Sequence, residues 1–241
     1  MTSRRMNRGI PRTYARLIWM APLLVFPSVL AQPPALASRE LSPGDIHPQA
    51  SRVYVRVGRV GLGHEHAVEG QIQSGRLIPG AEENAGQIVF DMASFAADTA
   101  RARQVIGLSG TTSVGTQQQV NANMRGAAVL DIGRFPTASL RVTAMRPTGT
   151  DSPRQIPQYQ IDGEFHLHGV VRPIRILAEV EELPGWFRVR GGFALQQTHY
   201  GIQPFSKAFG AIGVTDRLDI WGDLYVARTA SIAADSATIS R

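Results

Sequence analysis

Hydrophobic and polar residues alternate through most of residues 52–228, in short runs that are separated by glycine and proline. Alternation with a period of two is typical of a strand that buries one face and exposes the other. The clearest run covers residues 159–168, where Phe165 and Leu167 alternate with polar neighbours, and the Gly-Val-Val-Arg-Pro sequence of residues 169–173 indicates a chain reversal. The centre of the chain therefore predicts antiparallel sheet.

Eight such runs are expected to form strands, and no helix-length segment recurs between them. This order argues against a parallel sheet with crossover helices and favours an all-β antiparallel barrel or sandwich. An eight-stranded barrel either fills its interior with side chains or leaves room for one small or elongated ligand. The expected strands contain residues 53–57, 64–73, 87–92, 140–144, 159–167, 174–180, 187–195 and 218–226.

Residues 93–136 interrupt the alternation. Residues 116–119, Thr-Gln-Gln-Gln, fit a helix capping box, and Val120 and Met124 follow at helical spacing. We expect one or two short helices here, ending before Pro136 and lying over an opening of the barrel. The fold class predicted from the residues is an all-β antiparallel barrel or sandwich of about eight strands with a short helical insertion.

The first 37 residues have the three-part layout of a secretory signal peptide. Five arginines without an acidic residue precede the apolar residues 17–31, and an Ala-x-Ala site ends at Ala37. Cleavage is expected after Ala37, with Ala31 as the alternative. The apolar run has 15 residues and is shorter than the ~20 that a membrane-spanning helix needs, so we expect no stable membrane span after cleavage.

The rest of the chain divides into a flexible lead-in at residues 38–51, one barrel domain at residues 52–228 and a disordered tail at residues 229–241. The signal indicates a periplasmic or secreted protein. Because all five charges of the signal are arginines, its removal lowers the net charge from +6 to +1. Near neutrality argues against a nucleic-acid partner. The chain has no cysteine, which excludes disulfides, thiolate nucleophiles and thiolate metal ligands.

Two histidine pairs, His64/His66 and His166/His168, raise the question of a zinc or copper site. Imidazoles at positions i and i+2 of one strand point the same way and can share a metal. The first pair is in phase with Val68 on the buried side, whereas the second alternates with the apolar residues of its strand. Unless a bulge reverses one pair, they face opposite sides of the barrel wall. We therefore expect no metal site, hydrogen-bonded histidines near a barrel mouth for the first pair, and a solvated face for the second.

An enzyme is not expected either. The nearest sequence to the nucleophile elbow of a serine hydrolase, Gly-Leu-Ser-Gly-Thr at residues 107–111, has the wrong spacing. Paired carboxylates that would indicate acid–base catalysis do not recur, and no cofactor is expected.

Several short motifs, in one order along residues 52–228, resemble the YceI-like domain. The resemblance implies an exported, lipocalin-like β-barrel associated with binding polyisoprenoid or quinone-type lipids. Val171 and His199 depart from the family pattern, where a threonine and an acidic residue are usual. The matching residues are Gly63–His66 with Glu69–Gly70, Asn123–Gly126 leading to Val129–Asp131, Arg134–Thr137, Leu167–Pro173, and Tyr200–Phe205 with Val214–Asp216.

The hypothesis that follows is an exported protein that holds one isoprenoid-like or quinone-like lipid in the barrel for transport or storage. Two alternatives stay open: a structural or interaction module with a solid core, and a histidine-based metal-binding protein. A homodimer formed across a sheet edge is open as well. The residues expected to bind the lipid chain are Val68, Ile72, Leu140, Val142, Phe165, Leu167, Ile176 and Phe193.

Overall fold

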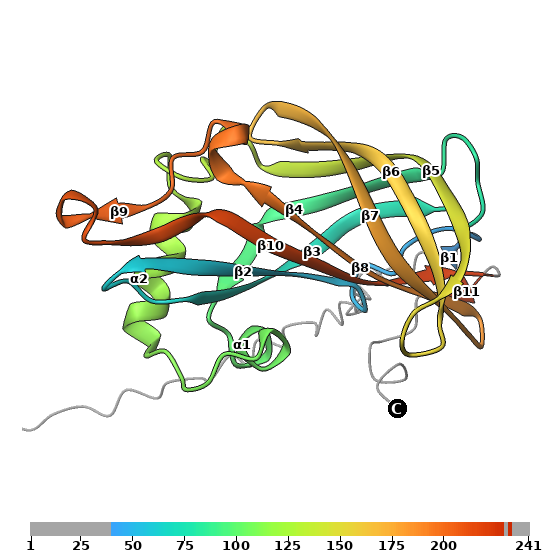
Figure 1. The fold of residues 1–241 in the computed structure, drawn as a ribbon, viewed down its shortest axis with the longest axis horizontal. Helices are drawn as coiled ribbons and strands as arrows, with labels where there is room; N and C mark the ends of the chain where they lie inside the picture. The colour runs from blue at the N-terminus through green and yellow to red at the C-terminus, as the bar shows by residue number, and fades with distance from the viewer. Residues whose placement is uncertain (1–39, 229–230, 233–241) are drawn as a thin grey trace, which may run out of the picture. The chain divides into compact units, whose positions relative to one another are not determined.

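Eight long antiparallel strands form a closed barrel in the computed structural model, which describes residues 40–228 and 231–232 (Figure 1). Each strand pairs with the next along the chain, and β10 closes the ring by pairing with β2, where Ile220 lies opposite Val55. The all-β antiparallel barrel is thus confirmed. Its strands are β2 (Arg52–Gly61), β3 (His66–Leu77), β4 (Gly86–Ala97), β5 (Thr137–Asp151), β6 (Pro157–Leu167), β7 (Val170–Leu183), β8 (Trp186–Gln196) and β10 (Ile212–Ala227).

The alternation of β6 shows why these segments form a barrel. Phe165 and Leu167 are buried inside it, whereas Glu164 on the outer face accepts hydrogen bonds from Arg141 of β5, at 2.6 Å and 3.1 Å. Phe165 lies directly opposite Leu140 in the β5–β6 register, so that the inward side chains of neighbouring strands meet. The core is the barrel interior.

Strand β4 extends to Ala97, five residues beyond the expected end at Met92. The alternation is broken there because the β3–β4 register shifts between Glu69 and Gln71 and again between Ile72 and Ser74. A bulge inserts an extra residue, so the alternation of buried and exposed side chains changes phase there. The last residues of the strand therefore no longer fit a pattern with a period of two.

Two helices follow β4, as the interruption of the pattern predicted. Helix α1 (Ala100–Ile106) begins at the N-cap Thr99 and stops at Gly107, whose φ of 82° is the left-handed conformation that glycine adopts without strain. Helix α2 (Val114–Arg125) has Ser113 as its N-cap, with the hydroxyl accepting from the backbone N–H of Thr116. The expected capping box at residues 116–119 was therefore placed too late: Thr116 lies inside the helix.

The described part of the expected flexible lead-in lies against the barrel. β1 (Glu40–Leu41) pairs with β11 (Ser231–Ile232), which belongs to the segment expected to be a disordered tail. Ile46 is buried, and its backbone N–H donates to Gly75 of β3. These residues lie at the end of the barrel opposite α1 and α2 (Figure 1).

Three short elements complete the fold: η1 (Gln197–Tyr200), β9 (Ser206–Lys207) and η2 (Ala208–Gly210). Within the described ranges, no helix has the length and apolar character needed to cross a membrane. The expected signal peptide at residues 1–37 lies outside the described residues.

Candidate ligand cavity

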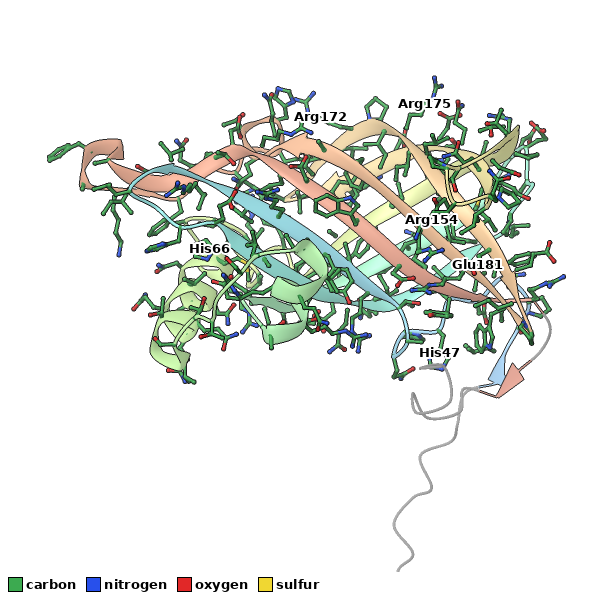
Figure 2. The ribbon with its side chains drawn as sticks, turned by 60° about the horizontal axis from the view of Figure 1, so that its bottom comes forward. His47, His66, Arg154, Arg172, Arg175 and Glu181 are labelled. Atoms are coloured by element: carbon green, nitrogen blue, oxygen red, sulfur yellow. The ribbon has the colours of Figure 1, made fainter. Side chains whose placement is uncertain are left out.

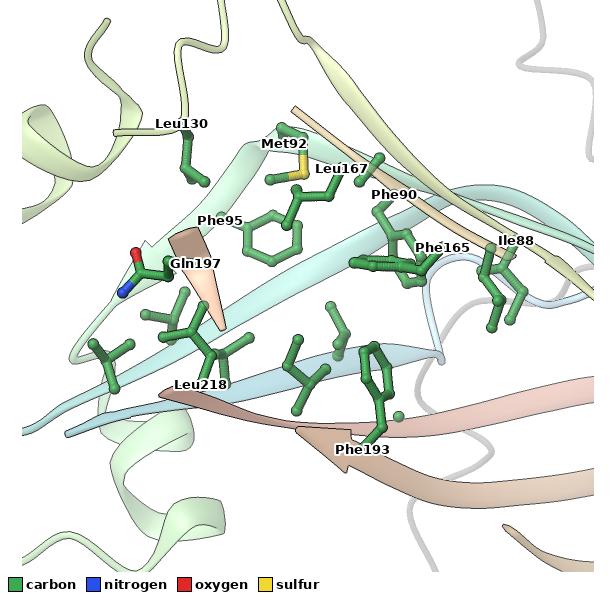
Figure 3. Close-up of a pocket in the computed structure, with 18 of the residues that line it drawn as sticks. Ile88, Phe90, Met92, Phe95, Leu130, Phe165, Leu167, Phe193, Gln197 and Leu218 are labelled. Atoms are coloured by element: carbon green, nitrogen blue, oxygen red, sulfur yellow. The ribbon is translucent and has the colours of Figure 1, made fainter. Parts of the chain in front are cut away.

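The barrel encloses a cavity of about 230 Å³ (Figure 3). Every one of the eight barrel strands contributes to its lining, together with helix α2 and the segment that follows it. This volume is slightly below the usual range of pockets that bind drug-sized ligands, and it is large enough for one narrow molecule. Apart from His66, Asn123 and Gln197, the lining side chains are apolar.

Seven of the eight residues expected to contact a lipid line this cavity, and Ile72 does not. They are Val68, Leu140, Val142, Phe165, Leu167, Ile176 and Phe193. Ile72 is buried in the core with 3 % of its surface exposed, but it lies between the two register shifts of β3 and β4. Its neighbours Gln71 and Gln73 are exposed, so Ile72 points into the barrel as expected and packs in the core without lining the cavity.

Phe165 is the centre of an aromatic cluster inside the barrel (Figure 3). Its ring centroid lies 6.1 Å from Phe90, 5.4 Å from Phe193 and 5.9 Å from Tyr200, in edge-to-face arrangements. Such pairs stabilise packing beyond the area that they bury. The cluster fixes the middle of the cavity wall across three strands and η1.

Helix α2 closes one end of the cavity. Val120 and Met124 line it, and Leu130 joins them from the following segment. The helix is tied to the end of β4: Gln117 donates to the Ala97 carbonyl at 2.9 Å, and Asn121 accepts from the Ala97 N–H at 2.7 Å. The expectation of helices over an opening is therefore confirmed for α2.

Arg125, at the C-terminal end of α2, adds a further bond to β4. Its Nε and Nη2 both donate to the Phe95 carbonyl, at 2.9 Å and 2.6 Å. Phe95 lines the cavity because Gly70 on β3 leaves room for its ring: a Cβ at Gly70 would lie 2.4 Å from Phe95 Cε2. This glycine belongs to the Glu69–Gly70 motif of the sequence.

His66 is the polar residue of the cavity with the best-defined surroundings (Figure 2). Its Nδ1 lies 2.7 Å from Asp98 Oδ2, and the side chains are 16 % and 1 % exposed. Asp98 Oδ1 accepts from the Ala67 N–H at 3.1 Å and from Arg103 at 3.0 Å. Burial raises the pKa of Asp98, but the hydrogen bonds from His66 and the Ala67 amide outweigh it and hold this pKa below its ordinary value.

The other histidines lie elsewhere. His64 is exposed in the loop before β3 and, unlike His66, does not line the cavity. His166 and His168 differ from the expected solvated face: both are half-buried, with a buried Nε2 that has no hydrogen-bond partner, and His168 packs on Phe135 with ring centroids 4.4 Å apart. His168 ends β6 in a turn with a φ of 52°, which the strand pattern could not show. Within the described ranges, no group of three His, Asp or Glu residues is placed to hold a metal.

A family model for the YceI-like domain matches residues 45–224. The chain belongs to the YceI-like domain family. This membership accounts for the order of the short motifs, and the match covers the whole eight-stranded ring apart from the last residues of β10. No curated protein sequence matches the chain.

Two solved structures resemble this YceI-like domain. A polyisoprenoid binding domain from Saccharophagus degradans is 13% identical, with a TM-score of 0.53, over 77% of this chain and 99% of that one. BcnA from Burkholderia cenocepacia is 17% identical, with a TM-score of 0.49, over 73% of this chain and 96% of that one. At this identity the likeness to the Saccharophagus domain shows the fold alone.

Sequence reasoning missed the polar side of the cavity. Asp98 is 32 residues from His66, and nothing in the local pattern links the two. Gln197 follows β8 with no periodic signal, and Asn123 was recognised only as part of a motif. The helical spacing of Val120 and Met124 was visible, but not that they face the ligand space.

Proposed function

We propose that this protein is exported and holds an isoprenoid-like or quinone-like lipid in its barrel for transport or storage. The observation that carries the proposal is the almost wholly apolar cavity inside the barrel, which an elongated hydrocarbon chain matches and a water-soluble metabolite does not. A solved neighbour described as a polyisoprenoid binding domain has the same fold and supports this ligand class.

Burial of the chain supplies the affinity. Each buried methylene contributes about 0.8 kcal/mol, so that one five-carbon isoprenoid unit adds roughly 4 kcal/mol before the losses of binding entropy are subtracted. Two or three such units therefore suffice for useful affinity without any charged contact. The aromatic cluster around Phe165 gives the cavity a rigid wall against which such a chain packs.

The alternatives receive less support. A solid-core module conflicts with the cavity at the centre of the barrel. A histidine-based metal protein would need both pairs at one place, and the structure separates the exposed His64 from the half-buried His166 and His168.

The export step rests on residues 1–37, whose arginine-rich start, apolar run and Ala-x-Ala site favour a periplasmic or secreted location. Secretion with loss of residues 1–37, read from the N-terminal sequence of the mature protein, would test it.

Leu167→Asp tests the lipid-binding role. Leu167 is 8 % exposed and lines the cavity, so that a carboxylate there would be desolvated against the hydrocarbon chain. We expect loss of uptake of a fluorescent polyprenyl probe by at least about 100-fold, the factor that roughly 3 kcal/mol gives.

Val171→Asp is the matched control, since Val171 is 49 % exposed on the neighbouring β7. It should fold and take up the probe like the wild type. Full uptake by a folded Leu167→Asp variant, as judged by its near-UV circular dichroism, would contradict the proposal.

A further inference from the structure

The polar groups of the cavity gather at the end that the helices cover. His66 begins β3, Asn123 lies in α2 and Gln197 begins η1. His66 lies opposite Val57 in the β2–β3 register. The next residue, Gly58, packs against Thr215, and the Thr215 carbonyl accepts a hydrogen bond from the Gln197 side chain at 2.8 Å. These contacts connect His66 and Gln197 at the same end of the barrel. The opposite end is formed by apolar residues such as Leu77, Ile88 and Ile161. An amphiphilic ligand is thereby given one orientation, with its polar group toward the helices.

The hydrogen-bonding roles of two of these groups follow from their partners. Asp98 Oδ2 lies 2.7 Å from Nδ1 of His66, so a proton on Nδ1 donates to the carboxylate, and in the neutral ring Nε2 is then the acceptor. The His66 side chain lines the cavity. Asn123 Oδ1 accepts from Gln119 at 3.0 Å, which leaves the Asn123 amide N–H groups as donors. His66 and Asn123 thus offer an acceptor and a donor at the polar end of the cavity.

Charged groups are kept out of the lining. Among residues 40–228, no Asp, Glu, Lys or Arg side chain lines the cavity. The two nearby guanidinium groups are engaged elsewhere: Arg103 binds Asp98 and the carbonyls of residues 109 and 110, and Arg125 binds the Phe95 carbonyl. A phosphate or carboxylate in the cavity would lose its hydration without a cation to replace it.

We propose that the His66–Asp98 pair recognises an uncharged hydroxyl headgroup, that of an isoprenoid alcohol or phenol, and that the cavity discriminates against phosphorylated lipids. The hydroxyl hydrogen donates to His66 Nε2, and its oxygen accepts from the Asn123 amide. Asp98 is a positioning residue that fixes the tautomer of His66. This inference rests on the proposed lipid-binding function and narrows its ligand class.

Three ligands with one isoprenoid chain separate the headgroup from the chain: farnesol, farnesyl methyl ether and farnesyl diphosphate. The ether keeps the oxygen acceptor but has no hydrogen to donate to His66. We expect the mature protein to bind farnesol about fivefold to tenfold more tightly than the ether, which is the factor that one ordinary hydrogen bond gives. The diphosphate should bind more weakly than both in titration calorimetry.

His66→Phe removes the acceptor and keeps an aromatic ring in the wall. It should bring the ratio of farnesol to ether affinity to about one, with the affinity for the ether nearly unchanged. His64→Phe, in the same motif but exposed, is the matched control and should keep the wild-type ratio. In nitrogen NMR of the wild-type ring, farnesol should shift the Nε2 resonance of His66 and the ether should leave it in place, a response that a merely structural His66–Asp98 contact would not give.

Three outcomes would overturn the headgroup assignment: tighter binding of the diphosphate than of farnesol, equal binding of farnesol and ether by the wild type, or a ratio that His66→Phe leaves unchanged. If all three ligands bind equally, only this inference fails. If none of them binds, the proposed lipid-binding function itself fails. The two failures are thereby distinguishable in one set of titrations.

Discussion

The buried carboxylate of Asp98 is held by hydrogen bonds from three donors, His66, the Ala67 amide and Arg103. The backbone φ of Asp98 is 57°, in the left-handed region. Asparagine adopts that conformation more readily than most residues, so Asp98→Asn changes the charge with little backbone strain. Hydrogen bonds to an ionised group contribute about 1.5–3 kcal/mol, and we expect the variant to lose stability of this order at neutral pH.

The pH dependence of stability should change in the same variant. The pKa of Asp98 is lowered in the folded protein, so its contribution is present above the ordinary pKa of an aspartate and is lost as the pH falls through the lowered value. Urea unfolding between pH 3 and 7 should therefore show a smaller difference between wild type and Asp98→Asn at the acid end. A difference that stays constant over this range would contradict the role of the carboxylate.

Gly70 is a second residue whose role is set by one contact. Because a Cβ there would lie 2.4 Å from the ring of Phe95, Gly70→Ala forces this ring to move within the cavity wall. We expect a loss of about 1–3 kcal/mol in the free energy of unfolding, measured by denaturant titration, together with weaker ligand uptake.

Gly133→Ala is the control for this substitution, since no atom lies within 4 Å of a Cβ at that position and its φ is not positive. It should leave both stability and uptake close to those of the wild type. Equal effects of the two substitutions would show that the contact with Phe95 is not the cause.

Helix α2 is attached to the barrel by a small number of hydrogen bonds. A helix held in this way can open and close the end of the cavity that it covers. Gln117 and Asn121 bind both backbone polar groups of Ala97, and no residue of α2 is fully buried. Replacing both residues by alanine should loosen the helix more than the barrel. We expect ligand release, followed by stopped-flow fluorescence, to become about tenfold faster, the factor that 1.4 kcal/mol gives.

Gln118→Ala, on the exposed face of α2, serves as the control and should leave the release rate unchanged. Amide hydrogen exchange should rise in residues 114–125 of the double variant while the protection of β5 and β6 stays as in the wild type. If release does not change, α2 is a fixed wall, and the ligand leaves by another route.

At the level of elements, the sequence predicts best where one face of a strand is buried and the other is wet. The alternation located all eight strands, and the phase of β6 placed Phe165 and Leu167 inside. Prediction failed where the period is broken: the bulges between β3 and β4 obscured the last residues of β4. The N-cap of α2 was also misplaced, because serine and threonine are both common N-cap residues and the local sequence offers Ser113 as well as Thr116.

The polar end of the cavity could not be predicted because it is assembled from distant segments. His66 comes from β3, Asp98 from the turn after β4 and Gln197 from the start of η1. Period-two reasoning did place His66 on the inner side of the wall. It could not show the pairing with Asp98, since that contact depends on how the chain turns from β4 into α1.

At the scale of the whole molecule, the described residues 40–228 form a closed ring of eight strands around an apolar cavity. Closure removes the exposed sheet edges that otherwise favour aggregation, so the eight strands can stay long while the interior keeps room for a ligand. Ion pairs such as Arg141–Glu164 and Arg217–Asp219 lie on the outer surface, where they contribute little to stability. Charged side chains therefore face outward, and apolar side chains line the cavity.

Native mass spectrometry of the mature protein, purified from its own host without detergent, tests the central claim most directly. We predict a protein mass with one additional uncharged lipid, which organic extraction removes and which Leu167→Asp does not retain. A bare polypeptide mass for the wild type, unchanged after incubation with farnesol, would contradict the assignment of this barrel as a lipid-binding protein.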